Sequence, residues 1–491
     1  MDREHAGEMT SRVDASHDEP SSSNVTSSRE RKLLMKVDAC VLPTVIILYL
    51  LCFIDRTNIG NARIAGLEED LKLKGYDYNV VLSAFYVSYI VFEIPATLCC
   101  KLIGPGWFLP MTSFGFGAMS IATAFVRTRA QACAVRFLLG IFEAGVMPGC
   151  VYYLSRWYKR SELTFRLGLW LSMAPLAGAF GGMIASAILN LSSVGSFHGW
   201  QMIFAIEGIV TMCLALVSFF TLTDRPDTAR WMTEDEIRMI VGRIKSERLN
   251  QTELLDKIDT LKLRRGFSNP ITLAISFIFL LDSITVIAIS FFLPTIVRTI
   301  YPARSIVQQQ LLTVPPYIVG VVCTILITTV SWQMNSRQTL IAFTGPFVIA
   351  GYAMFLATMN SSVRYAAIFL CASTCFSLAA MTNAQVSANV LSDSARSIAI
   401  GTNVFFGYVG ALIASWTYLP GDSPRYAVGN GINLGCAVTW TIVAIFTKLW
   451  MTHDNRKRDR RQLESHTELA SLSDDEIANL EWKHPAWRWK P

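Results

Sequence analysis

Long apolar segments recur along this chain, and short polar connections separate them. Roughly twenty consecutive apolar residues are enough to cross the hydrocarbon core of a bilayer as an α-helix. Twelve spans of this kind are predicted, near residues 37–58, 78–100, 108–126, 130–154, 165–189, 200–222, 270–293, 311–331, 340–359, 365–383, 397–419 and 428–451. The pattern therefore predicts an all-α polytopic membrane protein.

The polar segments divide the chain into five parts. They are a Ser-rich N-terminal tail at 1–36, predicted to be disordered, a six-span half at 37–222, a charged linker at 223–268, a second six-span half at 269–451 and a polar tail at 452–491. Transporters built from two similar halves share this plan, with the substrate site between the halves near the bilayer midplane.

Composition and charge agree with a membrane protein. The chain is 52% hydrophobic and 16% charged, with a mean hydropathy of +0.38, whereas soluble domains are about 25% charged. The net charge of +6 lies in loops and tails, which favours anchoring at a membrane surface over nucleic-acid binding. The connection between spans 4 and 5 and the linker are rich in Lys and Arg, and the connection between spans 5 and 6 has neither. Both termini and the linker are therefore expected to be cytoplasmic.

Smaller signals refine this topology. No apolar core lies close to Met1, so the first span is expected to act as its own signal and anchor. The glycosylation sequons at Asn190 and Asn360 fall on predicted outer loops. The eleven cysteines lie almost entirely in apolar runs without metal-type spacing, so neither a disulfide framework nor a metal site is expected.

Charged residues inside predicted spans are the first functional candidates. Arg136 and Glu143 lie seven residues apart in the fourth span, on one helix face. Asp55 and Arg56 lie late in the first span, which Asn58 and Asn61 would extend along a wet face. Each such charge costs roughly 2.5–3.5 kcal/mol on insertion scales, so charges at this depth are either structural ion pairs or functional groups. An acid there can take up protons, and an arginine offers a two-pronged site for a carboxylate.

Other polar residues of the spans have several possible roles. None of the six histidines lies in a span, so carboxylates would have to carry any coupled protons. Asp282 is the only acid of the seventh span and is expected to face the cavity, where it either contacts substrate or does not. Asn383 and Asn403 either line the site or bond within the bundle. Four further residues are predicted to be structural or mechanical: Glu93, Glu207, Pro175 and Gly178.

Several stretches carry a family resemblance. They are 42–62 with Phe-Ile-Asp-Arg-Thr-Asn-Ile-Gly-Asn-Ala, 92–95 with Phe-Glu-Ile-Pro, 136–149 with Arg-Phe-Leu-Leu-Gly-Ile-Phe-Glu-Ala-Gly, 152–158 with Tyr-Tyr-Leu-Ser-Arg-Trp-Tyr, 176–182, 199–208, 424–426 and 455–460. In these stretches the chain resembles the major facilitator superfamily, and within it the fungal allantoate permease family of anion:cation symporters. The resemblance covers residues 31–485.

The resemblance implies proton-driven uptake of a small organic anion or carboxylate vitamin by alternating access. It implies that Asp55 and Glu143 couple protons, and that Arg56 and Arg136 hold the substrate or pair with these acids. The proton gradient replaces any cofactor, and we expect a monomer in the plasma membrane or the vacuolar membrane.

This chain departs from the family pattern at three places, one of which is Gly106, where many fungal relatives have Arg after Gly-Pro. The superfamily signature between spans 2 and 3 normally has an Asp where Lys101 stands, ahead of Gly104, so the cytoplasmic gate is expected to be held differently. The seventh span commonly lacks an acid where Asp282 stands, and an ionised Asp282 would repel an anionic substrate.

Other functions remain open at this level. One is an exporter of a fungal metabolite on the same scaffold, and another is a nutrient sensor that does not transport. A membrane enzyme is disfavoured, because the chain lacks Walker A, His-Glu-x-x-His and Gly-x-Ser-x-Gly patterns.

Overall fold

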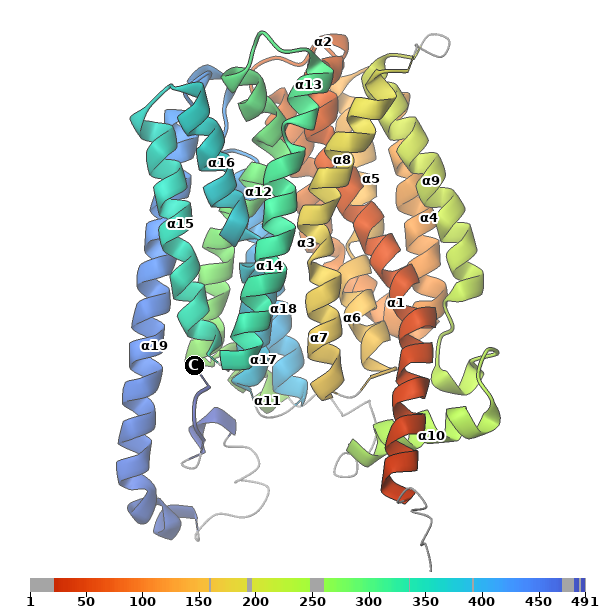
Figure 1. Ribbon diagram of the computed structural model, residues 1–491, viewed down its shortest axis with the longest axis vertical. Coiled ribbons are helices and arrows are strands. Elements are labelled where there is room, and N and C mark those ends of the chain that lie inside the picture. Colours follow the sequence, from red (N-terminus) through yellow and green to blue (C-terminus); the bar gives the residue numbers. More distant parts are fainter. Residues whose placement is uncertain are drawn as a thin grey trace, which may run out of the picture.

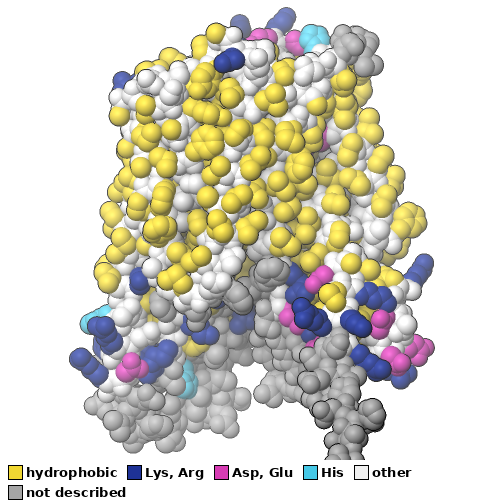
Figure 2. All heavy atoms as spheres, in the orientation of Figure 1, with side chains coloured by type: hydrophobic (Ala, Val, Ile, Leu, Met, Phe, Trp, Pro, Cys, Tyr) yellow, Lys and Arg dark blue, Asp and Glu magenta, His cyan; other side chains and the backbone are white. Residues whose placement is uncertain are grey.

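The computed structural model of the chain describes residues 22–158, 160–191, 197–247, 260–334, 336–390, 393–469, 481–484 and 487–490. Its described residues are helices joined by short connections, with no β-strand among them. The prediction of an all-α membrane protein is confirmed. Figure 2 shows a broad band of hydrophobic side chains, with charged side chains gathered at the two ends of the molecule.

The first helical group covers the predicted spans 1 to 6 (Figure 1). Its elements are α1 (Ser22–Ala62), the π-helical turn η1 (Arg63–Leu67), α2 (Glu68–Asp70), α3 (Asp77–Ile103), α4 (Pro105–Ala124), α5 (Arg129–Glu143), α6 (Val146–Ser155), α7 (Arg160–Leu171), α8 (Met173–Leu189) and α9 (Gly199–Thr221). The linker that follows carries η2 (Pro226–Thr228), α10 (Glu234–Glu247) and α11 (Thr260–Phe267).

The second helical group covers the predicted spans 7 to 12. Its elements are α12 (Pro270–Ile300), α13 (Ile306–Leu311), α14 (Val314–Met334), α15 (Arg337–Ala357), α16 (Ser361–Cys375), α17 (Leu378–Ala388), α18 (Asp393–Ala414), η3 (Pro420–Asp422) and α19 (Ala427–Leu469), followed by η4 (Glu481–Lys483) in the tail.

Ten helical stretches among the described residues are long and apolar enough to cross a membrane. The predicted spans 3 and 11 are not among these ten. They correspond to α4, which is rich in Gly, Ser and Thr, and to α18, whose apolar part covers only Ile398–Ala414. Both pack as full members of the bundle, α4 against α9 and α18 against α12.

Four predicted spans are broken into two helices each. Proline explains three of the breaks, because its ring nitrogen cannot donate to the carbonyl four residues earlier. Pro148 lies just after the α5/α6 break, Pro175 after the α7/α8 break and Pro315 after the α13/α14 break. The α5/α6 break directly follows Glu143, so this acid lies at the break within the fourth span.

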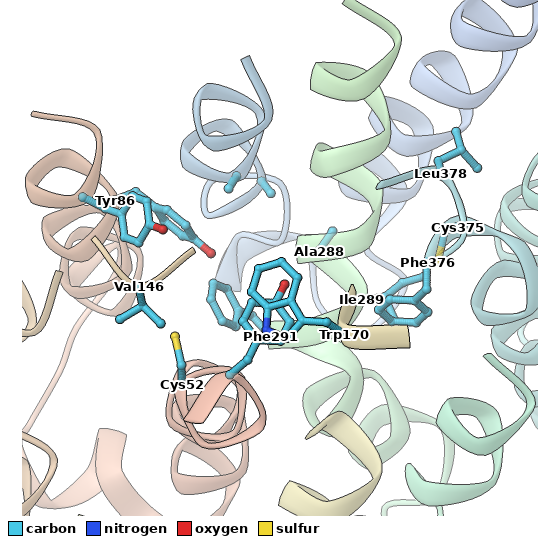
Figure 3. Packing of buried hydrophobic residues seen from close by; sticks show 14 of the residues in the cluster. Cys52, Tyr86, Val146, Trp170, Ala288, Ile289, Phe291, Cys375, Phe376 and Leu378 are labelled. Atoms are coloured by element: carbon cyan, nitrogen blue, oxygen red, sulfur yellow. The ribbon is translucent and has the colours of Figure 1, made fainter. Parts of the chain in front are cut away.

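The two groups meet along a central interface, in which α8 packs against α13 and α14, α1 against α12, and α3 against α18. Both α1 and the long α19 extend beyond the bundle at one end, called here the terminal side (Figure 1). Figure 3 shows the buried apolar packing, with Cys52 and Val146 of the first group and Phe376 and Leu378 of the second on either side of Phe291.

Close contacts seal the interface on the side opposite the termini. Gly60 of α1 lies so near α12 that a Cβ there would approach the Phe291 carbonyl oxygen to 2.4 Å. Asn79 Nδ2 donates to the Ser415 carbonyl oxygen at 2.5 Å, and Gln310 Nε2 donates to the Asn61 carbonyl oxygen at 3.3 Å. Helix α8 also has its small Gly178 against the Tyr317 ring of α14.

The structure corrects the predicted disordered tail at 1–36. Residues 22–36 are helical and form the first turns of α1, while residues 1–21 lie outside the described part. Charged side chains hold this extension: Lys36 donates to Glu236 of α10 at 2.7 Å, and Glu30 pairs with Arg243. The Lys36 hydrogen bond lowers the pKa of Glu236 below its usual value. A polar composition suggested disorder, whereas this segment is helical and pairs with α10 through Glu30 and Lys36.

The C-terminal tail returns to the terminal side of the second group. Trp489 is 2% exposed, and its indole Nε1 donates to Asp454 of α19 at 2.7 Å. The Lys490 carbonyl oxygen accepts from Gln385 Nε2 at 2.8 Å and from Asn389 Nδ2 at 3.1 Å. The tail therefore connects α19 with the end of α17.

Candidate functional site

Two ion pairs cross between α1 and α5. Arg56 Nε donates to Glu143 Oε2 at 2.5 Å, and Arg136 Nη1 lies 3.8 Å from Asp55 Oδ2. All four side chains are buried, with residue exposures of 0% to 5%. Adjacent residues on a helix point about 100° apart. Asp55 and Arg56 therefore pair with different residues of α5, Arg136 and Glu143, which lie about two helical turns apart. The two residues that share a face of α5, Arg136 and Glu143, therefore pair with α1 and not with each other.

Aromatic rings surround the Arg56 guanidinium. Its central carbon lies 4.9 Å from the ring centre of Tyr89, 5.0 Å from Phe53 and 5.3 Å from Phe85. The Tyr408 ring of α18 lies 5.9 Å away, and its hydroxyl donates to the Tyr89 hydroxyl at 2.6 Å. Ring faces attract cations, so this cage holds Arg56 in an apolar setting. Because Tyr408 belongs to the second helical group, the site is shared across the central interface.

Glu143 has a second donor from α1. Cys52 Sγ lies one turn before Arg56 and donates to Glu143 Oε2 at 3.2 Å. Glu143 is the last residue of α5, and the chain turns at Ala144 and Gly145 before α6 begins. A movement at this break would move the Glu143 carboxylate relative to Arg56.

The second ion pair is less completely bonded. Within the described part of the chain, both Asp55 carboxyl oxygens and the Arg136 atoms Nε and Nη2 have no hydrogen-bond partner. The Arg136 guanidinium lies 5.2 Å from the Phe204 ring centre. Buried charges with open hydrogen-bonding capacity are costly, so this pair is poised to accept water or another charged group.

The space at the site is small in this conformation. A cavity of about 10 Å³ lies beside Arg56 and Arg136, and α12 closes it through Phe291. Such a volume accommodates at most a single water molecule. A substrate of several atoms therefore needs the two helical groups to move apart before it can reach either arginine.

The structure corrects the expected wet face of α1. Asn58 and Asn61 are buried: Asn61 Nδ2 donates to Asn58 Oδ1 at 2.9 Å, and Asn58 Nδ2 donates to Glu207 Oε2 at 2.7 Å. This chain of hydrogen bonds ties α1 to α9. The prediction was wrong because α9 covers the face of α1 that carries Asn58, which the sequence alone does not show.

The predicted site residues of the second helical group are Asn383, Asn403 and Asp282. Asn403 Nδ2 donates to Asn383 Oδ1 at 3.1 Å, so the two form a bond within the bundle. Asp282 has 0% exposure, so no open cavity lies beside it in this structure, and its contact with substrate stays a prediction. Its helix, α12, packs against α16, α17 and α18.

The predicted gate residues lie at the terminal end of α3. Lys101 is exposed, and Gly104 has a positive φ of 94°, with Asp224 directly beside it. Asp224 Oδ1 accepts from the Gly106 backbone N–H at 3.3 Å, and Arg156 Nη1 lies 3.4 Å from its Oδ2. The carboxylate beside Gly104 therefore belongs to Asp224, in the segment after α9, whereas the superfamily signature has its Asp at the end of α3, where Lys101 stands here.

The remaining predicted residues lie outside the charged site. Glu93 is half-buried in α3, one turn beyond the aromatic cage, and Pro175 is buried near the start of α8. Asn190 and Asn360 are exposed, and the Asn360 side chain caps α16. Part of the first sequon, at residue 192, lies outside the described residues.

Sequence reasoning missed the residues around Arg56. Phe85 and Tyr89 are one helical turn apart in α3 and present one face to the arginine. Their spacing was visible in the sequence, but aromatic residues are common in apolar spans. The role of Cys52 as a donor and of Asp224 beside Gly104 depends on contacts between segments far apart in the chain.

Two groups of apolar helices, with a buried charged site beside the interface between them, match the plan of a membrane transporter. Residues 45–415 match the family model of the Major Facilitator Superfamily. The chain therefore belongs to this superfamily and is a secondary transporter, not an enzyme.

Relatives and solved structures agree with the family. The chain is 31% identical to an uncharacterized transporter of Schizosaccharomyces pombe, covering 93% of each chain. It is 29% identical to the high-affinity nicotinic acid transporter of Saccharomyces cerevisiae, covering 87% of this chain and 79% of that protein. A bacterial homolog of the human lysosomal transporter Spinster, crystallised in an inward-facing, unoccupied conformation, matches with a TM-score of 0.62 at 15% identity, over 83% of this chain and 95% of that one.

Proposed function

We propose that the protein imports a small organic anion together with protons by alternating access. The observation that carries this proposal is the crossed pairing of Asp55 and Arg56 with Arg136 and Glu143 within the first helical group, where Tyr408 of the second group reaches Arg56. Similarity to a nicotinic acid transporter supports a carboxylate as the substrate.

In the proposed cycle, proton uptake by an acid releases its arginine partner, which then binds the substrate. A proton that binds Glu143 removes the negative charge that holds Arg56, and the freed guanidinium can bind a substrate carboxylate through charge-assisted hydrogen bonds. In the same way, a proton that binds Asp55 would free Arg136 to bind the substrate. Loss of the proton restores the internal pair, which then competes with the substrate and promotes its release.

The aromatic cage supports a gating role for the same site. Tyr89 and Tyr408 bring α3 and α18 together directly beside Arg56. When the two helical groups separate there, Arg56 loses one wall of its cage and becomes accessible. We further propose that the terminal side is cytoplasmic, that the plasma membrane is the site of action and that the protein works as a monomer.

Uptake of labelled organic acids, nicotinate among them, into cells that express the protein tests this function. We expect uptake of at least one acid to increase when the outside medium is acidified. Glu143→Gln should abolish this acid-driven uptake but retain exchange of substrate across the membrane. Glu234→Gln is the control, because Glu234 lies exposed in α10 and pairs only with Arg238 there.

Two results would contradict the proposal. Full acid-driven uptake by Glu143→Gln would exclude Glu143 as the coupling acid. Absence of uptake for the whole panel, together with reduced retention of a metabolite by the expressing cells, would instead indicate export.

A further inference from the structure

Asp282 is a buried carboxyl group without a partner. It lies in the middle of α12 with 0% exposure, and neither of its carboxyl oxygens has a hydrogen-bond donor within the described residues. The three buried acids of the first helical group differ from it: Glu143 accepts from Arg56, Glu207 accepts from Asn58, and Asp55 lies near Arg136.

The surroundings of Asp282 contain no compensating charge in the described part of the chain. Helix α12 packs against α1, α11, α13, α16, α17, α18, α19 and the turn η1. The thiol of Cys375, the last residue of α16, is the titratable group that interacts with Asp282, and no described charged group of the other elements packed against α12 interacts with it. Polar groups of α17 and α18, such as Asn383 and Asn403, are bonded to each other.

An ionised carboxylate is not stable in such a place. Transfer of an isolated charge from water to an apolar interior costs so much free energy that the group binds a proton and becomes neutral instead. The neutral acid also has an O–H group, which can donate within the packed interior. The buried position and the missing donors therefore describe a carboxylic acid better than a carboxylate.

We propose that Asp282 is a second proton-binding site of the transporter, which holds a proton in this conformation and releases it in another. In the release step the O–H bond breaks, its electron pair stays on the carboxylate oxygen and the proton passes to water. Cys375 ends α16 at the break before α17, so movement of α17 at this break would admit water beside Asp282. The release step rests on the proposed proton coupling, whereas the bound proton does not.

A protonated Asp282 also resolves a conflict with an anionic substrate. An ionised Asp282 would repel a carboxylate that approaches α12, whereas the neutral acid would not. Deprotonation after the conformational change would then create a negative charge in the second helical group, which favours departure of the anion. Asp282 would thus act on the substrate from the opposite side of the interface to Glu143.

Infrared spectroscopy of the full-length protein in liposomes tests the bound proton without any substrate. We expect the difference spectrum of wild type minus Asp282→Asn, at neutral pH, to contain a carboxylic acid C=O band. Asp235→Asn is the control, because Asp235 lies exposed in the first turn of α10 and its replacement should remove only carboxylate bands. A carboxylate band in place of the acid band for Asp282 would overturn the proposal.

If Asp282→Asn does not fold, infrared spectroscopy with isotope-labelled aspartate tests the same bound proton. Wild-type protein with isotope-labelled aspartate shows the acid bands of aspartates alone, and Asp55→Asn removes the other buried aspartate of the spans. A labelled acid band that persists in Asp55→Asn supports the bound proton on Asp282. Its absence contradicts the proposal.

Uptake of nicotinate or another accepted acid at several outside pH values tests the release step. Asp282→Asn cannot release a proton, so we expect its uptake to respond less steeply to acidification than wild type. An unchanged pH response would show that the proton on Asp282 is permanent and would overturn release. Because the infrared experiment needs no transport, failure of the proposed function and failure of this inference are distinguishable.

Discussion

Two adjacent charged residues of α1 pair with two levels of α5. Arg56 binds Glu143, and Asp55 lies near Arg136, so no charge of this set pairs within its own helix. Pairing between helices makes the ion pairs dependent on how α1 and α5 are placed. A change in the protonation of Glu143 or Asp55 would therefore change how α1 packs against α5.

The sequence identified these four residues because charges are costly inside apolar spans. It did not identify their partners or the cage of Phe53, Phe85, Tyr89 and Tyr408, since pairing depends on the rotation of each helix about its axis. Their assigned roles stay predictions until transport is measured.

Removal of one member of the Arg56–Glu143 pair is expected to destabilise the protein. Arg56→Leu leaves Glu143 buried without its cation, and breaking such a pair costs roughly 3–5 kcal/mol of unfolding free energy. Arg56→Leu combined with Glu143→Leu should recover most of this loss, because two apolar side chains replace the whole pair. Thermal unfolding of the purified protein in detergent measures both variants.

The control for this prediction is Arg238→Ala, which removes an exposed pair with Glu234 of α10. Exposed pairs contribute about 0–1 kcal/mol, so the melting temperature should barely change. If the double variant proved no more stable than Arg56→Leu alone, the two residues would not form a coupled pair.

At the scale of elements, breaks within four of the spans and close packing on the side opposite the termini characterise this conformation. Prolines predict three of the four breaks, because each removes one backbone donor. The close approach of α1 to α12 at Gly60 was not predictable, since a glycine in a membrane helix has several possible packing partners.

Gly60→Ala is expected to loosen the seal between α1 and α12. The new Cβ would approach the Phe291 carbonyl oxygen to 2.4 Å, so the backbones must separate, at a cost of roughly 1–3 kcal/mol for overpacking. Hydrogen exchange should therefore become faster in residues 286–300 of α12 and near residue 415.

Gly431→Ala is the matched control for this substitution. Gly431 lies inside α19, and a Cβ there would meet no heavy atom within 4 Å, while the gain in helix propensity is the same. Equal exchange rates in the two variants would mean that Gly60 does not seal the interface.

At the scale of the whole molecule, polar segments at both termini belong to the folded structure. The first turns of α1 pair with α10, and the C-terminal tail buries Trp489 against α19. The predicted disordered N-terminal tail was wrong for residues 22–36, because its charges find partners on a linker helix. The other predicted boundaries between the five parts stay predictions.

Trp489→Ala is expected to release the C-terminal tail from the terminal side. The indole is 2% exposed and lies 5.6 Å from the Trp450 ring centre, and truncation of a buried Trp costs roughly 3–5 kcal/mol. Hydrogen exchange should become faster at residues 385–389, whose side chains bind Lys490.

Trp107→Ala serves as the control for the tail, because Trp107 is a mostly exposed residue at the start of α4. It should leave exchange at residues 385–389 unchanged. Were Trp489→Ala to leave this exchange unchanged as well, the tail would not support the end of α17.

The sequence by itself determined the class of fold and the set of charged candidates. Apolar length sets the number of membrane crossings, and the insertion cost of a charge singles out Asp55, Arg56, Arg136 and Glu143. Only the tertiary structure decided that these charges pair across helices, that Asp282 has no partner, and that α9 covers Asn58. The physical reason is that periodicity defines the faces of each helix, whereas the packing of the helices decides which faces meet.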